Sequence, residues 1–460
     1  MHTQLPSSDH ASLRADLGSQ IVLPGDEAWD AARRPWNLAR DQHPFAVAQP
    51  RTVADVQSVV RWAGEHGRRV AAQGSGHGAG PLDSLEDSIL LRTTHLASVS
   101  IDAAARRARV GAGARWRDVV NPAAAHGLAA LAGSSPDVGI AGYTLGGGMG
   151  WLARRHGFAT NAVEAIELVT GDGRLVRADA AHEPDLFWAL RGGGGNFGVV
   201  TALEFALFPV TQIYAGSLFW PMERAGEVIA AWRDRLDALP REVTSAVRMF
   251  QFPPLPQLPE PLRGRSFVVI GAACLLSPAE ADALLRPWRA LAPELDTLAV
   301  MPAPGLGTVA MDPEDPVPMV GDGMLLRELP DAAIDTLLAR TGSGTGSPLL
   351  LLELRQLGGA LAERSPHHGV LDSTDAAVAL FGAGMALDGA GAQAVDDRLS
   401  AVLRSLEPWD GGRYFNFSDR VSDAAAIFRP EPYQRLQAIR RRYDPGSLFV
   451  ANHGIPVAGG

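Results

Sequence analysis

A single histidine stands among glycines in the first part of the chain. His77 lies in the stretch AAQGSGHGAG, which begins at Ala71 and alternates glycine with other residues after Gly74. Glycines let the backbone approach a ligand closely and direct its N–H groups toward it. The stretch therefore indicates a bound cofactor with an imidazole held against it. The alternative interpretation is a tight turn between two strands with a histidine that faces solvent.

Two further stretches are rich in glycine. One begins at Gly133 and reads GSSPDVGIAGYTLGGGMG, and the other begins at Leu190 and reads LRGGGGNFG. The second contains a formal GxGxxG pattern, but the residues that follow it, VVTALEFALF, have the pattern of a strand. A nicotinamide-dinucleotide loop must follow a strand and open a helix. The context therefore excludes that site and leaves either a ligand-binding turn or a glycine-rich hairpin.

A charged pair interrupts an apolar strand in the second half of the chain. In LLLLELRQLGG, the period of two places Leu351, Glu353 and Arg355 on one face and Leu352 and Leu354 on the other. A carboxylate and a guanidinium on one face of an apolar strand indicate either a substrate-facing wall or a structural ion pair. The sequence leaves both interpretations open.

Composition excludes several kinds of chemistry. The length of 460 residues predicts two domains. All 41 basic residues are arginine, which excludes lysine Schiff bases and Walker-type phosphate loops. Cys274 is the only cysteine, so internal disulfides and thiolate-cluster metal sites are excluded. No HExxH-like motif occurs, and we expect no metal.

Charge and hydropathy indicate a protein that acts on a small molecule. The net charge of −10 and the lack of a basic stripe interleaved with aromatic residues argue against a nucleic-acid partner. Residues 1–18 contain no apolar stretch of signal-peptide length, and no later segment reaches membrane-spanning length. We therefore expect a cytoplasmic protein with a small-molecule substrate and no membrane partner.

Periodicity predicts the elements that position these residues. A helix expected over residues 53–66 is followed by a strand at 68–74, so His77 lies just past a strand end, where α/β sheets commonly place ligands. The middle of the chain alternates long strands with helices, which predicts an antiparallel sheet with helices on one face. Residues 252–262 and 302–323 are expected to be irregular connections.

Four motifs in order resemble one known family. They are the three glycine-rich stretches and the end of the chain, where YFNFSD is followed by RLQAIRRRYDPGSLFVANHGIP. Together they resemble the berberine bridge enzyme-like oxidoreductases of the vanillyl-alcohol oxidase (PCMH-type FAD-binding) superfamily, over residues 41–208 and 411–456. The resemblance implies an α+β protein with a two-subdomain FAD-binding PCMH-type domain and an antiparallel-sheet substrate domain covered by helices. The expected division is a lead-in at 1–40, the FAD domain at 41–210, the substrate domain at 211–408 and a C-terminal segment at 409–460 that returns to the FAD domain.

The resemblance also implies the cofactor and its tether. FAD is expected to be bonded covalently through His77 to its 8α carbon. Many members add a second tether through a cysteine where this chain has Ser135. A hydroxyl is a poor nucleophile without an activating base, so we expect a single link.

Further residues are expected along FAD by the same resemblance. They are Gly74, Ser75, Gly76, Gly78, Val138, Gly139, Gly142, Gly146, Gly147, Gly148, Gly198, Val199, Val200, Asn416 and Asn452. The glycine triplet is expected beneath the flavin ring, where any side chain would collide with it. Val138 is expected to border the flavin carbon attacked by oxygen, and a small β-branched residue there is associated with oxidases. The chain departs from the family pattern at Gly78 and at Asn161–Ala162, which leaves the detailed flavin contacts open.

An oxidase of this kind must remove a proton from an alcohol or amine while a hydride leaves the adjacent carbon for the flavin. The candidates for this base are Tyr414, which is the only phenol of its motif, Glu353, and then Tyr143. We predict an FAD-dependent oxidase that takes a hydride from a C–H bond next to oxygen or nitrogen and reduces O₂ to H₂O₂, as a monomer or homodimer. The alternatives are a flavin monooxygenase or oxygenase of the same family and a catalytically silent binding protein on the same scaffold.

Overall fold

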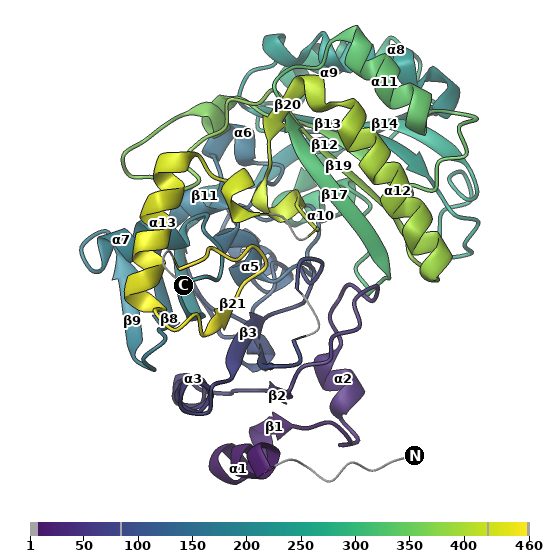
Figure 1. Cartoon of the computed structure of the whole chain (residues 1–460). Helices are drawn as coiled ribbons and strands as arrows, with labels where there is room; N and C mark the ends of the chain where they lie inside the picture. The colour runs from purple at the N-terminus through teal and green to yellow at the C-terminus, as the bar shows by residue number, and fades with distance from the viewer. Residues whose placement is uncertain (1–7, 83–84, 421–422, 458–460) are drawn as a thin grey trace.

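Three large β-sheets and the helices packed on them form the protein (Figure 1). The computed structural model describes residues 8–82, 85–420 and 423–457. Residues 1–7 of the predicted lead-in and 458–460 of the predicted C-terminal segment lie outside this part. The mixture of separate helices and sheets confirms the predicted α+β class.

The first sheet is mostly parallel and leads the chain into the His77 loop. Its order is β1 (Ile21–Val22), β2 (Ala46–Ala48), β4 (Ser88–Arg92), β3 (Arg69–Gln73) and β21 (Phe449–Val450), and β1 pairs antiparallel. Helix α3 (Val53–Glu65) begins with a capping box between Thr52 and Asp55 and buries its apolar face in the core beside β3. The predicted helix and strand are confirmed, and β3 ends directly at the glycine-rich loop.

The second sheet is antiparallel. Its order is β5 (Val99–Asp102), β6 (Arg107–Gly111), β10 (Val199–Ala206), β8 (Val163–Val169) and β9 (Leu175–Asp179). The helices that share its core are α4 (Arg117–Ala124), α5 (Ile140–Leu145), α7 (Pro184–Leu190) and α13 (Pro430–Tyr443). Strand β10 begins directly after the glycine-rich stretch at Leu190. This confirms the predicted strand, and the stretch therefore does not open a helix as a nicotinamide-dinucleotide loop must.

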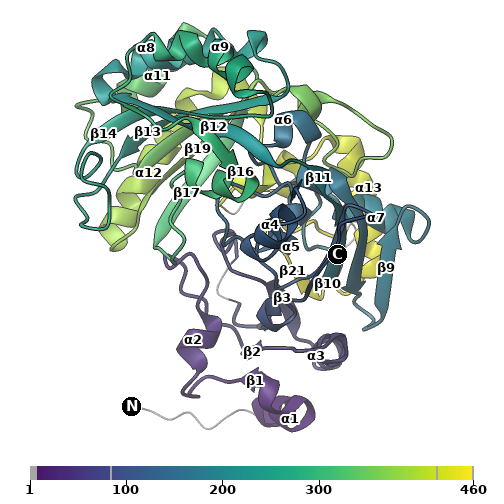
Figure 2. The ribbon, with the colours of Figure 1, turned by 180° about the vertical axis from the view of Figure 1, so that it is seen from behind.

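The third sheet is antiparallel and has helices on one face. Its order is β15 (Leu295–Asp296), β12 (Gln212–Pro221), β14 (Ser266–Cys274), β13 (Val243–Gln251), β18 (Leu351–Gln356), β19 (Val378–Met385), β17 (Met319–Leu326) and β20 (Asp410–Gly412), while β16 (Ala299–Pro302) pairs with β12. Helices α8 (Ala225–Arg233), α9 (Pro278–Arg289), α11 (Asp331–Thr341) and α12 (Gly389–Ser405) cover its outer face (Figures 1 and 2). The predicted antiparallel sheet covered by helices is therefore confirmed.

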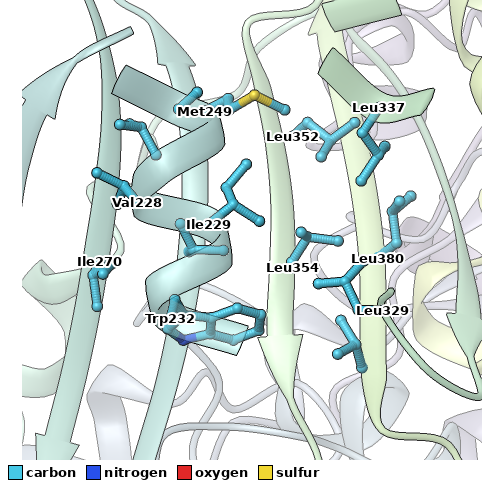
Figure 3. Packing of buried hydrophobic residues seen from close by; sticks show 14 of the residues in the cluster. Val228, Ile229, Trp232, Met249, Ile270, Leu329, Leu337, Leu352, Leu354 and Leu380 are labelled. Atoms are coloured by element: carbon cyan, nitrogen blue, oxygen red, sulfur yellow. The ribbon is translucent and has the colours of Figure 1, made fainter. Parts of the chain in front are cut away.

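An apolar core packs between this sheet and the helices on its outer face (Figure 3). Ile229 and Trp232 of α8 lie in one buried cluster with Leu352 and Leu354 of β18. Because side chains alternate along a strand, Glu353 points to the opposite face. The helices thus hold one face of the sheet and leave the other for a site.

Short elements connect the sheets. They are α1 (Ser8–Leu17), α2 (Trp29–Arg33), α6 (Ala153–His156), α10 (Leu306–Val309), β7 (Leu128–Ala129) and β11 (Phe208–Pro209). The C-terminal helix α13 and strand β21 lie against the first two sheets, far from the helices of the third (Figure 1). Among the described residues, no helix combines the length and the apolar character needed to cross a membrane.

One stretch expected to be an irregular connection is partly ordered. Residues 302–323 contain α10 and the first half of β17, so the expectation is wrong there. Gly321 and Gly323 weaken the strand signal in the sequence. Packing requires them to be small, because a Cβ on Gly321 would lie 2.7 Å from the Phe381 ring and one on Gly323 would lie 2.4 Å from the Leu380 carbonyl oxygen.

Candidate active site

A cavity of about 420 Å³ lies between the glycine-rich loops and the face of the third sheet opposite helices α8, α9, α11 and α12. Its wall includes thirteen of the residues predicted to contact FAD, namely Gly74, Ser75, Gly76, His77, Gly78, Ser135, Val138, Gly139, Gly142, Gly198, Val200, Asn416 and Asn452. The three candidate bases, Tyr143, Glu353 and Tyr414, line the same cavity. The fold therefore brings the four sequence motifs and the charged strand to one place.

Four of the predicted FAD residues lie outside the cavity wall. They are Gly146, Gly147, Gly148 and Val199. Val199 points into the core of the first sheet, and the alternation along β10 leaves Val200 to face the cavity. A Cβ on Gly146, Gly147 or Gly148 would collide with Asn416, Leu371 or Tyr143, respectively. The triplet is thus surrounded by protein side chains, and its small size lets Tyr143 and Asn416 close on the turn after α5.

His77 is held in one orientation at the cavity wall. Its Nδ1 lies 2.8 Å from Ser75 Oγ, which also accepts a hydrogen bond from the Gly139 N–H at 3.2 Å. The imidazole stacks on Trp36, with ring centroids 4.0 Å apart and planes inclined by 17°. On the other side, Nε2 lies 3.4 Å from Oδ2 of Asp137. These contacts favour a ligand-facing imidazole over a turn histidine that faces solvent.

Ser135 has a defined role in this arrangement. Its hydroxyl donates a hydrogen bond to the Asp137 carboxylate. Burial raises the pKa of Asp137, but the nearby imidazole of His77 and the hydrogen bond from Ser135 outweigh burial and hold the pKa below its ordinary value. Asp137 is therefore a carboxylate at neutral pH, and Ser135 helps to keep it in place.

Glu353 is buried between two arginines. Its carboxylate accepts a 2.8 Å hydrogen bond from Arg355 Nε and further hydrogen bonds from Arg248, the residue paired with it on β13. Burial raises the pKa of Glu353, but the charges of Arg248 and Arg355 outweigh burial and lower the pKa to about 2. The two arginines are anchored in turn by the carbonyl oxygens of Ala310 and Met149, at 2.9 Å and 2.6 Å. The ion pair is thus structural, and it also faces the cavity.

Two phenols, the buried Tyr414 and the half-buried Tyr143, line the cavity near Arg355. The Asn416 amide donates to the Tyr414 hydroxyl oxygen at 3.4 Å. Burial raises the pKa of Tyr414, while the charge of Arg355 opposes the rise. Tyr143 packs edge-on against Trp116 with ring centroids 5.4 Å apart, and burial raises its pKa as well. Both phenols therefore hold their protons at neutral pH.

The cavity wall fits the FAD that the resemblance implies. Open space lies where a Cβ on Gly142 or Gly195 would stand, so both glycines present bare backbone to the cavity. The buried hydroxyl of Tyr143 has no hydrogen-bond partner among the described residues. Buried polar groups are normally paired, so this wall is suited to a ligand with polar edges.

Three residues around the cavity were missed in the sequence. Arg248 carries the same signal as Glu353, a charge within an otherwise apolar strand, and Asp137 is the only carboxylate of its glycine-rich motif. No sequence pattern singles out Trp36, because only the fold brings it against His77.

Comparisons with known proteins agree with this site. Residues 44–179 match the FAD binding domain family, and residues 413–456 match the family described as berberine and berberine like. The chain is 30% identical to (R)-6-hydroxynicotine oxidase of Paenarthrobacter nicotinovorans over 464 residues, spanning 96% of this chain and 98% of that protein. The crystal structure of 6-hydroxy-D-nicotine oxidase from Arthrobacter nicotinovorans is similar with a TM-score of 0.82 at 25% identity, covering 95% of this chain and 98% of that one. For xylooligosaccharide oxidase of Myceliophthora thermophila the TM-score is 0.84 at 21% identity, covering 98% and 99%, which extends the likeness of fold. This chain therefore belongs to the berberine bridge enzyme-like family of FAD-linked oxidoreductases.

Proposed function

We propose that this protein is an FAD-dependent oxidase that takes a hydride from a C–H bond next to oxygen or nitrogen in a small molecule and reduces O₂ to H₂O₂. The observation that carries the proposal is the single cavity that joins the His77 loop and its glycines to the charged wall of β13 and β18. Val138 lines the same cavity, and the small residue expected of an oxidase supports the assignment. The sequence match to (R)-6-hydroxynicotine oxidase, which covers nearly the whole chain, supports it as well.

The residues divide the work between the two sides of the cavity. FAD would supply the hydride acceptor when bound. The glycine-rich loops would hold it, with His77 as its covalent tether. Across the cavity, Glu353 and its arginines would orient the substrate. The ionised form of Tyr414 would take the substrate proton, and the positive charge of Arg355 would stabilise this phenolate before the transfer.

Four apolar side chains in the remaining wall favour a small, largely apolar substrate. Phe250, Met319, Phe381 and Phe417 line the cavity around the charged cluster. An oligosaccharide would leave many hydroxyl groups unpaired against these side chains, and each unpaired polar group costs about 1–3 kcal/mol. We therefore propose a ring-containing amine or alcohol with one polar anchoring group.

A substrate screen under anaerobic conditions tests this function. Purified protein is mixed with 6-hydroxynicotine, aromatic and alicyclic amines and alcohols, chitooligosaccharides and xylobiose, and the flavin absorbance is followed. We expect a small apolar amine or alcohol to bleach the flavin. Bleaching by oligosaccharides alone would overturn the substrate class, and retained flavin that no compound reduces would identify a silent scaffold.

His77→Ala should abolish covalent attachment of the flavin. The wild-type protein is expected to stay yellow through acid precipitation, because His77 is fixed at the cavity wall by Ser75 and Trp36. The variant should leave a colourless pellet with all its flavin in the supernatant, and it should turn over more slowly. Replacement of the exposed His126 by alanine is the control and should keep the colour. A colourless wild-type pellet would disprove the tether.

Ser135→Cys should permit a second tether. Ser135 lines the cavity near His77, and a thiol forms the thioether that a hydroxyl does not. Peptide mass spectrometry should find one flavinylated peptide in the wild type and a second one in the variant. Flavin on two residues of the wild type would refute the expected single link.

A further inference from the structure

Asp137 carries a buried carboxylate that has no part in the proposed oxidation. It lies between β7 and α5, behind His77 and outside the cavity wall, and its side chain is 1% exposed. Ser135 donates a hydrogen bond to Oδ1. Oδ2 has no hydrogen-bond partner among the described residues and lies 3.4 Å from His77 Nε2. A buried carboxylate oxygen without a partner is costly, so its position against the imidazole calls for a function.

The contacts of His77 favour one tautomer of its ring. The Gly139 N–H donates to Ser75 Oγ, which leaves the Ser75 hydroxyl proton available for His77 Nδ1. Nδ1 is then the acceptor, and the proton of the neutral ring lies on Nε2, toward Asp137 Oδ2. The electron pair that would bond to carbon is thus assigned to Nδ1, where it accepts the Ser75 hydrogen bond, and the proton is assigned to Nε2.

We propose that Asp137 positions His77 and accepts its Nε2 proton when the imidazole becomes bonded to FAD. The inference rests on the proposed tether through His77. In the net reaction, an N–H bond of His77 and a C–H bond of the flavin 8-methyl group break, and one C–N bond forms. The two electrons pass to the flavin and then to dioxygen, which leaves with the two protons as H₂O₂.

The pairing is suited to this step on chemical grounds. A buried carboxylate beside an imidazole N–H fixes the tautomer and stabilises the positive charge that develops on the ring, as in Ser-His-Asp triads. Here the charge develops as the electron pair of the opposite nitrogen forms the bond to carbon. Ser135 holds the carboxylate through its other oxygen, so Asp137 is a positioning residue that acts on the flavin through His77.

The rate of flavin attachment in Asp137 variants tests the proposal. Full-length protein from riboflavin-starved cells is incubated in air with saturating FAD, and the covalent fraction is followed by intact-protein mass. Asp137→Asn preserves the shape and the acceptor oxygen toward Nε2 but does not take a proton. We expect attachment to be slower by ~10²- to 10⁴-fold, with reversible FAD binding and the thermal midpoint close to wild type.

Two further variants separate proton transfer from structure. Asp388→Asn, at the N-terminus of α12, is the matched control and should attach flavin at the wild-type rate, since asparagine also caps helices. Asp137→Ala leaves room for a small carboxylate, so added formate should accelerate attachment in proportion to its concentration. A purely structural role of Asp137 would give no such dependence on formate.

These experiments distinguish failure of the proposed role of Asp137 from failure of the proposed tether through His77. Attachment at the wild-type rate in Asp137→Asn would overturn the role of Asp137, and so would an attachment rate in Asp137→Ala that formate does not raise. Wild-type protein that never acquires covalent flavin would overturn the tether itself.

Discussion

Replacing Tyr414 by phenylalanine should slow anaerobic reduction of the bound flavin by ~10²- to 10⁴-fold, the usual cost of losing a general base. The Tyr414 side chain lines the cavity and is 3% exposed. Phenylalanine keeps the ring that packs against Phe158 and Phe417, with centroids 6.0 Å and 5.1 Å away, and removes only the hydroxyl. Stopped-flow absorbance with a substrate from the screen measures the rate, while the flavin spectrum and the reaction with oxygen should stay close to wild type.

The pH dependence of this rate gives an independent check. Burial raises the pKa of Tyr414, so the phenol is protonated at neutral pH and its ionised fraction grows as the pH rises. Flavin reduction in the wild type should therefore accelerate from about pH 7 to about pH 9, and Tyr414→Phe should lose this acceleration. Tyr433→Phe, on α13 away from the cavity wall, is the control. Reduction at wild-type speed in Tyr414→Phe would place the proton acceptor elsewhere, with Tyr143 the next candidate.

Glu353→Gln should strongly destabilise the protein. The neutral amide leaves the charges of Arg248 and Arg355 without their carboxylate, and both arginines are less than 9% exposed. Breaking a buried ion pair by removing one partner costs about 3–5 kcal/mol, so the free energy of unfolding should fall by that amount in urea titrations at neutral pH. Glu363→Gln removes a carboxylate that is 58% exposed and pairs with Arg241, and it should cost only ~0–1 kcal/mol. Equal losses in the two variants would contradict the buried cluster.

The acid sensitivity of stability has a defined sign. The pKa of Glu353 is lowered from an ordinary value of 4.5 to about 2 in the folded protein. Its contribution to stability is therefore fully present above its ordinary pKa and is lost as the pH falls toward the folded value. Glu353→Gln should remove this part of the acid sensitivity. Because a carboxylate with so low a pKa is a weak base, this variant should slow flavin reduction less than Tyr414→Phe.

Local patterns in the sequence predict most of the helices and strands that position the site. The helix and strand before His77, the strand after the third glycine-rich stretch and the two faces of β18 all agree with the structure. Each depends on periodicity or turn residues within a short window. The motifs also predict which loops line the cavity: the His77 loop follows a strand that the pattern identifies, and the other loops are assigned to the cofactor by the family resemblance of their motifs.

Contacts between distant segments are what the sequence does not reveal. Arg248 meets Glu353 through the register of β13 and β18, which no local pattern fixes. Strand β17 is hidden because packing against Phe381 and Leu380 selects glycines where a strand signal needs branched residues. The three residues Gly146–Gly148 must be small because neighbouring protein side chains leave no room for a Cβ. Most of these neighbours come from distant parts of the chain, so the sequence does not reveal them.

The fate of the electrons tests the central claim most directly. A substrate from the screen is oxidised under isotopically labelled dioxygen, and the peroxide formed and the label in the product are counted against the substrate consumed. An oxidase gives one H₂O₂ for each substrate molecule and no label in the product, which is the result we predict. Labelled oxygen in the product, with peroxide well below one for each substrate molecule, would contradict the proposal and identify an oxygenase.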